Sequence, residues 1–239
     1  MIKRALLGGL VALFVCAVHA QNNDAAEVKK AVEASLGKGA KVDGVRDAGF
    51  LGLYEVTIGN DILYTDKKAN YLVLGNVVDT KTHKNLTEER KNKLAQIKFS
   101  DLPLDLAVKQ VRGNGKRVFA TFEDPNCGYC KKLAREMQGM TDVTIYTFLY
   151  PILSPDSSDK SKTIWCAQDR AKAWTEWMIN GTEPAAAKCD TPTDKVVALG
   201  RKLNIGGTPT IFFADGSRVP GYLPVVQLEQ ILNNKLAGN

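Results

Sequence analysis

The sequence contains few of the residues and segments on which several protein classes depend. It has two histidines among 239 residues, and beyond the N-terminus no apolar run reaches the 18 or more residues of a membrane span. A structural zinc site built on one Cys-x-x-Cys pair needs a second close Cys pair or a His pair. Cys166 and Cys189 are widely separated and His83 lies far away in sequence, so we predict no metal site and no cofactor. The chain also has no internal repeat and no low-complexity tract.

The charge of the chain is also unremarkable in its distribution. Without two basic residues near the N-terminus, 30 of the 32 Lys and Arg residues remain against 26 Asp and Glu residues. The lysines are scattered rather than gathered into one stripe with aromatic residues between them, as a nucleic-acid-binding surface requires. We therefore expect a solvated, mildly basic surface and no nucleic-acid partner.

The first 20 residues have the pattern of a secretory signal peptide. Two basic residues precede an apolar stretch over residues 5–18, and small residues stand before the expected cleavage after Ala20. The stretch is too short for a transmembrane anchor. Cys16 raises the alternative of a lipoprotein, but a valine precedes it where a lipid-attachment signal has Gly, Ala or Ser. We expect residues 1–20 to be removed and the mature chain to be exported.

Residues 21–82 are predicted to form a small α+β domain. Apolar residues recur at helical spacing over 27–36, and strand-forming stretches follow at 50–58, 61–65 and 71–74. A unit of this size buries only a small core. We therefore expect its apolar strands to need a partner, and a second copy of the chain is the obvious one.

Residues 83–98 are predicted to form a helical linker. Most of the segment is charged and helix-prone, its apolar face is thin, and Asn85 with Glu88 resembles a capping box. Such a helix is typical of an exposed connector rather than of a core element.

Residues 99–239 are predicted to form an α/β domain. The strand–helix–strand order at its start indicates a βαβ unit with parallel strands. Trp165, Trp174 and Trp177 lie in a helical region, and we interpret them as core packing rather than as a ligand platform. The expected elements are strands at 117–122 and 142–148 around a helix at 127–137, then a strand at 210–213, a turn at Asp215-Gly216 and a helix at 227–236.

Four cysteines remain after processing, and an even number in an exported chain indicates disulfides. Two of them form Cys127-Gly128-Tyr129-Cys130 at the expected start of a helix, whose unpaired N–H groups and partial positive charge favour a thiolate. We expect Cys127 to be the attacking thiol and Cys130, one turn on, to be the buried resolving thiol. Gly128 allows a substrate backbone to approach closely. An inert disulfide is the alternative for this pair.

A second motif, Gly206-Gly207-Thr208-Pro209-Thr210, precedes a strand far along the chain. Taken alone, Thr208-Pro209 is expected to be trans, because only about 5–6% of X-Pro bonds in folded proteins are cis. Together with the Cys-Gly-Tyr-Cys helix, the charged linker, the N-terminal domain and the later cysteine pair, this motif resembles the DsbC/DsbG family of periplasmic disulfide isomerases along nearly the whole mature chain. Gly128 favours DsbC over DsbG, which has Pro at that position.

The resemblance implies a thioredoxin-like catalytic domain with a helical insertion, an N-terminal dimerisation domain and a V-shaped homodimer. It further implies a cis Thr208-Pro209 that packs against the active-site cysteines and, with Gly128 and Tyr129, contacts substrate. The buried acid of thioredoxin has no counterpart six residues before Cys127, where Thr121 stands. Proton handling at Cys130 is therefore expected to rely on another group.

Cys166 and Cys189 are expected to form a structural disulfide, with free thiols as the alternative. A bridge across their 22 intervening residues is worth about 3 kcal/mol by the loop-entropy account. Proteins of the DsbC family have a comparable second disulfide. The resemblance also implies a periplasmic location, misfolded exported proteins with disulfides as substrates, and a membrane reductase of DsbD type as electron donor.

These features favour a protein disulfide isomerase with chaperone activity, because a dimerisation domain and linker make little sense on a simple oxidant. A DsbG-like reductase that protects single cysteines is the alternative among enzymes. A dithiol oxidase of DsbA type is disfavoured, because that family normally lacks the extra N-terminal domain. A chaperone-type binding protein, in which the cysteines are secondary, is the alternative from another class.

Overall fold

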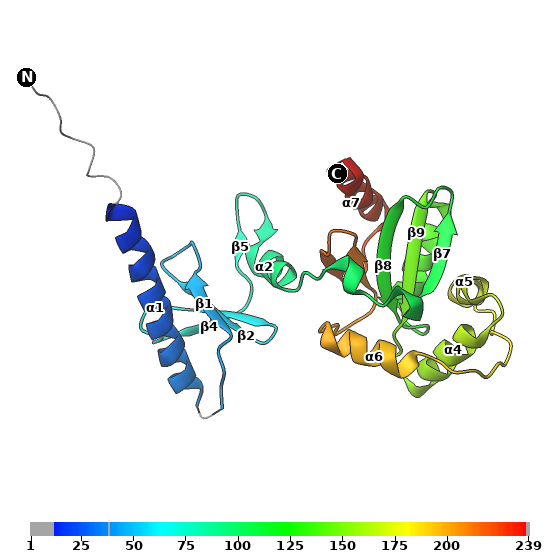
Figure 1. Cartoon of the computed structure of the whole chain (residues 1–239), viewed down its shortest axis with the longest axis horizontal. Coiled ribbons are helices and arrows are strands. Elements are labelled where there is room, and N and C mark those ends of the chain that lie inside the picture. The colour runs from blue at the N-terminus through cyan, green and yellow to red at the C-terminus, as the bar shows by residue number, and fades with distance from the viewer. Residues whose placement is uncertain (1–11, 38, 238–239) are drawn as a thin grey trace, which may run out of the picture. The chain divides into compact units, whose positions relative to one another are not determined.

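A computed structural model describes residues 12–37 and 39–237, which divide into two compact units between Lys91 and Asn92 (Figure 1). The division falls inside the segment predicted as the linker, and the predicted domain limits themselves stay a prediction. Much of the predicted signal peptide lies outside the described residues, and its last part, residues 12–20, is the start of a helix. Among the described helices, none combines the length and apolar character that crossing a membrane requires.

The first unit consists of an antiparallel four-stranded sheet and a long helix. The sheet has the strand order β1-β2-β3-β4, so β4 forms an edge. A two-stranded ladder and a second helix follow. The elements are α1 (Ala12–Leu36), β1 (Gly44–Asp47), β2 (Tyr54–Ile58), β3 (Asp61–Thr65), β4 (Leu72–Leu74), β5 (Val78–Asp79), β6 (Lys84–Asn85) and α2 (Leu86–Leu94).

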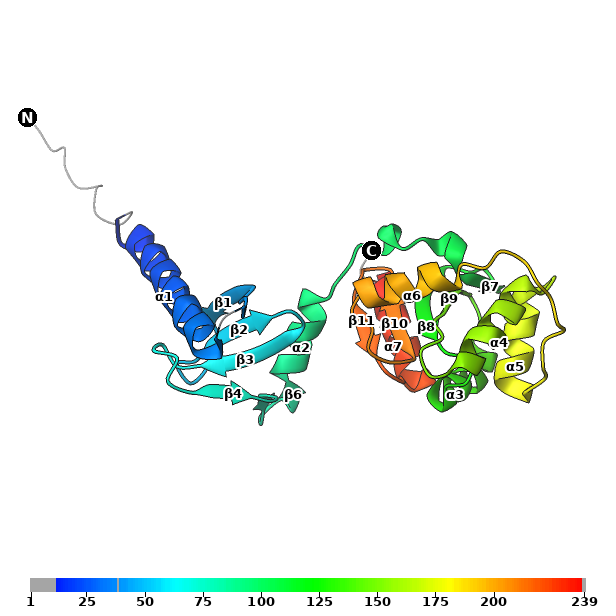
Figure 2. The same ribbon diagram turned by 90° about the horizontal axis from the view of Figure 1, so that it is seen from below.

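One face of α1 packs on this sheet. Val28 and Val32, one turn apart, contact Val42, Val56 of β2 and Leu63 of β3, and all five are buried. Figure 2 shows α1 lying along the sheet. The helix ends where it was predicted but begins upstream of residue 27, and the strand predicted at 50–58 begins only at Tyr54, because residues 50–53 form a turn. Strand β1 was missed.

Helix α2 differs from the exposed connector that was predicted for residues 83–98. It covers only Leu86–Leu94, and it is docked on the first unit. The buried carboxylate of Glu55 on β2 accepts hydrogen bonds from Arg46 Nε at 2.8 Å and from Arg90 Nε of α2 at 2.9 Å. The buried Thr87 hydroxyl lies 2.7 Å from the Tyr64 hydroxyl. Two long-range polar contacts, which the local sequence pattern does not reveal, therefore hold the helix.

The second unit is built on a five-stranded sheet in the order β11-β10-β8-β9-β7. β8 and β9 are parallel and α3 connects them, which confirms the predicted βαβ unit, while the other neighbours are antiparallel. The elements are η1 (Phe99–Asp101), η2 (Leu104–Leu106), β7 (Val108–Arg112), β8 (Arg117–Glu123), α3 (Gly128–Glu136), η3 (Met137–Gly139), β9 (Val143–Leu149), α4 (Pro155–Cys166), α5 (Arg170–Asn180), α6 (Thr193–Lys202), β10 (Thr210–Phe213), β11 (Arg218–Pro220) and α7 (Val225–Ala237).

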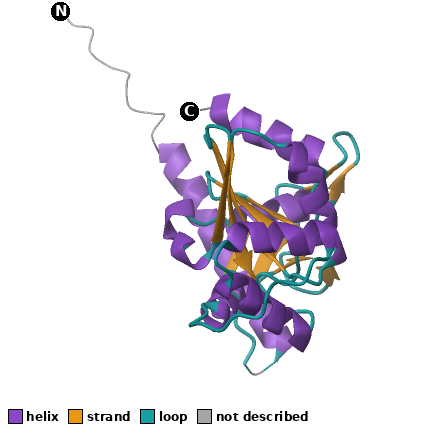
Figure 3. Ribbon diagram, turned by 90° about the vertical axis from the view of Figure 1, so that its right-hand side faces the viewer, coloured by secondary structure: helices purple, strands orange, loops and turns teal. Residues whose placement is uncertain are grey.

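Helices lie on both faces of the sheet (Figure 3). Side chains that alternate along β8 and β10 fill two cores, one on each face. Phe119 and Ile211 face the core shared with α3 and α7, which supply Leu133 and Leu228. On the opposite face Phe122 stacks on Phe148 with ring centroids 4.5 Å apart. Val196 of α6, Ile205 and Phe212 complete that core. Helices therefore cover both faces of the sheet, and the predicted α/β class of this domain is confirmed.

The helical insertion forms a third core beside α3. Trp165, Trp174 and Trp177 from α4 and α5 are buried there together with Cys130 and Ala134, which confirms that the three tryptophans are core residues.

The predicted hairpin turn at Asp215-Gly216 joins β10 to β11. Strand β11 was missed because it has only three residues, and β7 was missed because three of its five residues are polar.

Gly200 of α6 provides a stability test of the packing between α6 and the sheet. A Cβ atom on Gly200 would overlap the ring of Tyr150, which is itself buried, so Gly200→Ala is expected to destabilise the protein by about 1–3 kcal/mol. The matched control is Gly139→Ala, where a Cβ meets no atom within 4 Å. Urea unfolding of both variants checks the difference, and equal midpoints would contradict the packing described for α6.

Candidate active site

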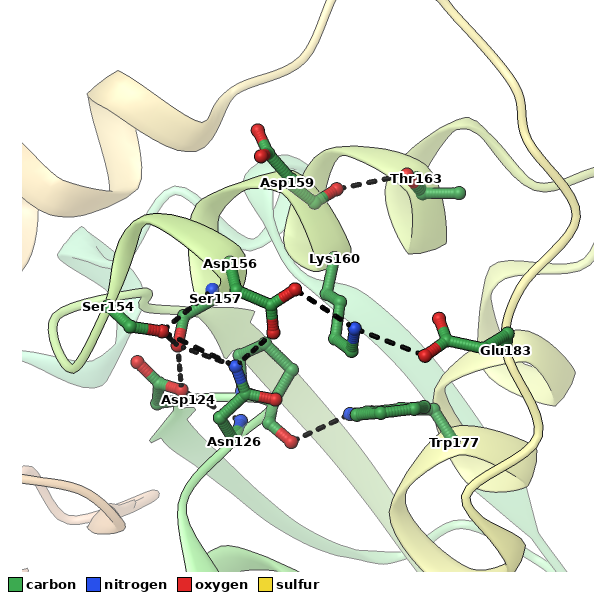
Figure 4. Close-up of polar contacts among 11 residues, drawn as sticks. Asp124, Asn126, Ser154, Asp156, Ser157, Asp159, Lys160, Thr163, Trp177 and Glu183 are labelled. Atoms are coloured by element: carbon green, nitrogen blue, oxygen red, sulfur yellow. Dashed lines mark hydrogen bonds and ion pairs between the residues drawn. The ribbon is translucent and has the colours of Figure 1, made fainter.

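The loop between β8 and α3 is fixed by the buried carboxylate of Asp124. One carboxylate oxygen accepts the backbone N–H groups of Ile152 and Leu153 at 2.8 and 2.9 Å. The other accepts the backbone N–H of Asn126 at 2.8 Å and the Ser157 hydroxyl at 2.7 Å (Figure 4). Since a carboxylate offers about four lone-pair sites, these contacts satisfy it. Asp124 therefore ties the loop before Cys127 to the segment that follows β9.

The helical insertion contacts the same loop. The indole N–H of Trp177 donates to the Pro125 carbonyl at 2.7 Å, and Asn126 Nδ2 donates to Asp156 at 2.6 Å. Lys160 lies 3.1 Å from Asp156 and 3.2 Å from Glu183 (Figure 4). The loop is thus held from β9, α4 and α5, and Cys127 is positioned by contacts outside its own helix.

Cys127 is the N-cap residue of α3, and Cys130 lies in the first turn of the helix. The Cys130 backbone N–H donates to Cys127 Sγ at 3.4 Å, and Cys127 Sγ lies 3.3 Å from the Thr208 carbonyl oxygen. Cys127 keeps 6% of its surface exposed, whereas Cys130 keeps none. Of the two buried thiols, Cys130 is the deeper one, as expected, and the role of Cys127 as the attacking thiol stays a prediction.

The two thiols have opposite pKa shifts. The hydrogen bond with the Cys130 side chain, which outweighs burial, and further bonds from the backbone N–H groups of Cys130 and Tyr129 lower the pKa of Cys127 from 9.0 to about 5. Burial, reinforced by the interaction with Cys127, raises the pKa of Cys130. Near neutral pH the geometry thus holds a thiolate at Cys127 and a protonated thiol at Cys130. This difference agrees with the roles expected for a nucleophile and a resolving thiol.

The Thr208-Pro209 peptide bond is cis, which corrects the expectation from base rates and agrees with the one from the family resemblance. The loop is held by the Thr210 hydroxyl, which donates to the Gly207 carbonyl at 2.9 Å, and by the Gly221 N–H, which donates to the Pro209 carbonyl at 2.8 Å. An open cavity of about 220 Å³ adjoins it, lined by residues 204–208, Thr210, Arg218, Pro220 and Gly221. The structure therefore brings Thr208 and Cys127 together although 81 positions separate them.

Gly128 and Tyr129 lie on the accessible side of the motif. A Cβ on Gly128 would meet no atom within 4 Å, and Tyr129 is 64% exposed. The Tyr129 ring lies 6.0 Å from that of Tyr222, whose hydroxyl donates to Glu136 at 2.7 Å. Both residues of the motif are thus accessible to a bound chain, and their role in substrate binding stays a prediction.

Sequence reasoning missed Glu123, the last residue of β8. Its side chain is completely buried, and neither carboxyl oxygen has a hydrogen-bond partner within normal geometry. Burial raises its pKa to about 8, against a smaller opposing effect of the Thr121 hydroxyl. Thr121 and Glu123 are two positions apart on a strand and share a face. One sequence signal could have identified Glu123: it is an acidic residue at the end of a buried apolar strand, just before the motif.

Cys166 and Cys189 form a disulfide with an S–S distance of 2.08 Å, so the alternative of free thiols does not hold in this structure. The bridge joins the last residue of α4 to the segment before α6. Cys127 and Cys130 are free. Within residues 12–37 and 39–237 no group of three or more His, Cys, Asp and Glu side chains is placed to hold a metal ion.

A five-stranded α/β sheet with a Cys-x-x-Cys pair at a helix N-terminus and a cis-Pro loop beside it defines the thioredoxin-like class. Residues 104–236 match the thioredoxin-like domain family, and residues 19–88 match the family described as the disulfide bond isomerase protein N-terminal domain. Curated relatives named thiol:disulfide interchange protein DsbC match as well. The chain belongs to the DsbC family.

These relatives differ in how much of them is matched. A probable DsbC of Bordetella pertussis is 56% identical over 178 residues, which is 74% of this chain and 64% of that protein, so the match spans less than two thirds of its length. DsbC of Salmonella typhimurium is 30% identical over 94% of this chain and 92% of its own, and DsbC of Escherichia coli K12 is 29% identical over 98% and 96%. The crystal structure of a Neisseria gonorrhoeae disulfide interchange protein has a TM-score of 0.54 and 46% identity, covering 56% of this chain and 97% of that one.

The low pKa of Cys127 predicts how its reactivity depends on pH. Since only the thiolate reacts with iodoacetamide, the alkylation rate should be nearly constant between pH 7 and 8 and fall as the pH drops through about 5. Mass spectrometry after brief alkylation of the reduced protein measures this rate and shows the labelled residue. A rate that still rises steeply above pH 7, as for an ordinary cysteine of pKa about 8.5, would contradict the assignment.

Proposed function

We propose that this protein is an exported thiol–disulfide exchange enzyme that reshuffles incorrect disulfides in other exported proteins. The observation that carries the proposal is the pairing of a low-pKa Cys127, which keeps a small exposed area at the N-cap of α3, with a fully buried, protonated Cys130. A thiolate is the reactive species in disulfide exchange, and a low thiol pKa also makes it a good leaving group. The same sulfur can therefore both attack a substrate and be released from it.

The reaction starts when the Cys127 thiolate attacks a substrate disulfide. An S–S bond forms between Cys127 and one substrate sulfur, and the other substrate sulfur leaves as a thiolate. In isomerisation, a second substrate thiolate attacks the mixed disulfide, forms a new substrate disulfide and releases the Cys127 thiolate with no net redox change. In reduction, Cys130 attacks instead, and the protein is left with a Cys127–Cys130 disulfide and the substrate with two thiols.

The open surface around Cys127 suits a peptide substrate. Gly128 offers no side chain, Tyr129 is exposed, and the cis Thr208-Pro209 loop presents backbone beside the cavity. We assign substrate binding to Gly128, Tyr129, Thr208 and Pro209. Chaperone activity belongs to the same proposal, since a surface that binds peptide segments of a substrate can also bind unfolded chains.

The N-terminal unit supports the isomerase over a simple oxidant. Its edge strand β4 carries exposed apolar side chains, with Leu74 78% exposed and the preceding Tyr71 75% exposed. An unpaired apolar edge strand is prone to pair with another chain. We propose that β4 pairs in a homodimer. A periplasmic location and a DsbD-type reductase, which would return Cys127 and Cys130 to the thiol form, complete the proposal.

Refolding of a scrambled ribonuclease tests the exchange reaction. Cys127→Ala is expected to reduce the rate of native disulfide recovery to the uncatalysed level, because Cys130, the remaining free thiol of the motif, is fully buried. Cys130→Ser is expected to retain part of this isomerisation and to lose the net reduction of disulfides. Full activity of Cys127→Ala would refute the assignment, and activity that depends entirely on Cys130 would favour the DsbG-like reductase.

The same variants separate the binding-protein alternative. If the protein acts as a chaperone in addition, Cys127→Ala still suppresses aggregation of an unfolded test protein while it fails to rearrange disulfides. If no measurable function is lost in Cys127→Ala, the cysteines are secondary and the protein is a binding protein.

Sedimentation equilibrium tests the dimer. The chain is expected to be a dimer at micromolar concentration, and Leu74→Lys should shift it to monomer because a charge is placed on the exposed edge strand. Val226→Lys on α7 is the control, since Val226 is 66% exposed but lies in the other unit. A wild-type monomer, or a Leu74→Lys variant that remains dimeric, would contradict the proposed interface.

A further inference from the structure

Glu123 is a buried acid that the exchange chemistry above does not yet use. It is the last residue of β8, four positions before Cys127, and none of its surface is exposed. Neither of its carboxyl oxygens has a hydrogen-bond partner, and within the described residues it belongs to no ion pair. Burying a carboxyl group without a partner costs several kcal/mol on transfer scales, so such a group calls for a physical reason.

Glu123 lies on the face of β8 that also carries Phe119 and Thr121, and Phe119 packs on Leu133 of α3, the helix that contains Cys130. Cys127 acts electrostatically on Glu123, and Glu123 acts in the same way on Cys130. The third neighbour is the Thr121 hydroxyl. The adjacent carboxylate of Asp124 is occupied by its own four hydrogen bonds. Glu123 therefore shares its environment with Cys127 and Cys130 and with no basic side chain among those that act on it.

We propose that Glu123 is the acid–base group of the resolving step, accepting the proton of the Cys130 thiol as Cys130 attacks the mixed disulfide. The inference rests on the proposed function, and it assigns a route for a proton that has no path to solvent through Cys130 itself, which is fully buried.

The step balances in atoms and electrons. The Cys130 S–H bond breaks and its proton passes to the Glu123 carboxylate, while the sulfur electron pair forms the bond to Cys127 Sγ. The bond between Cys127 Sγ and the substrate sulfur breaks, and the substrate leaves as a thiolate that takes the proton from Glu123. Two electrons are transferred: the cysteine pair is oxidised to a disulfide, and the substrate sulfur is reduced to a thiol.

The charge on Cys127 determines at which stage of the reaction Glu123 can act as a base. While Cys127 is a thiolate, its charge helps to hold the pKa of Glu123 near 8, so at neutral pH the carboxyl group is mostly protonated and two negative charges are not buried together. Formation of the mixed disulfide removes the charge on Cys127. The pKa of Glu123 then falls, and the carboxylate form becomes more populated at the stage when Cys130 must lose its proton.

Stopped-flow reaction of the reduced protein with the chromogenic disulfide DTNB separates the two steps. The first release of thionitrobenzoate reports attack by Cys127, and the second reports closure by Cys130. Glu123→Gln keeps the size of the side chain but cannot accept the proton. It is expected to slow the second release by about 100-fold or more at pH 7, as for the loss of a general base, and to leave the first release within about two-fold.

The pH profile distinguishes proton transfer from a structural effect. In the wild type the second release should level off above the pKa of Glu123 in the mixed disulfide. In Glu123→Gln it should keep rising with pH, because Cys130 must then ionise directly. Glu123→Asp should restore part of the plateau. Glu176→Gln on α5, whose carboxylate accepts a hydrogen bond from Asn180, is the control and should match the wild type.

A measurement without substitution at Glu123 keeps the proposal testable if these variants do not fold. The Glu123 carboxyl carbon, assigned by NMR through the backbone, is titrated with Cys127 free and with Cys127 blocked as a methyl disulfide in Cys130→Ser. Blocking should lower the pKa of Glu123. An unchanged pKa, or a second DTNB release unaffected by Glu123→Gln, would overturn the proposal.

Failure of this inference can be told apart from failure of the proposed function on which it rests. A Cys127→Ala variant with full isomerase activity refutes the exchange enzyme itself. A protein whose activity requires Cys127, but whose second release is the same in Glu123→Gln and wild type, refutes only the role of Glu123.

Discussion

The carboxylate of Asp124 is the constraint on which the geometry of the site depends. Four donors from three segments of the chain meet on this one side chain, which is buried at the end of β8. Hydrogen bonds to a charged acceptor are stronger than neutral ones, and the burial of such a group is tolerated only when its donors are all in place. The direction in which the chain enters α3, and with it the position of Cys127 Sγ, follows from this network rather than from the helix alone.

The fixed position of Cys127 at the N-cap of α3 explains why the pKa values of the two thiols differ so much. Cys127 receives the Cys130 N–H and lies beside the Thr208 carbonyl, while Cys130 lies under the first turn in a core that contains three tryptophans. Burial therefore disfavours the thiolate form of Cys130, whereas hydrogen bonds stabilise the thiolate form of Cys127. Glu123 adds a third titratable group to the same small volume, and the protonation states of the three are coupled.

The local parts of this arrangement were predictable from the sequence, and the long-range parts were not. The apolar strand before Cys127 and the helix after it predicted β8, α3 and the location of both thiols. The place of Thr208 next to Cys127 came only from the family resemblance, because no local pattern links residues so far apart. Glu123 was missed since a single acid after an apolar strand reads as the start of a loop. The docking of α2 was missed because Glu55 and Arg90 lie on elements whose contact depends on the tertiary fold.

The anchoring of α2 on Glu55 and Thr87 has a consequence for how the first unit unfolds. Arg90 of α2 and Arg46 of β1 donate to the same buried carboxylate on β2, and the Thr87 hydroxyl lies against that of Tyr64 on β3. Undocking the helix would leave the Glu55 charge buried with only part of its hydrogen bonds, which is strongly unfavourable. The helix and the sheet are therefore expected to be lost in one cooperative transition, although α2 covers only nine residues.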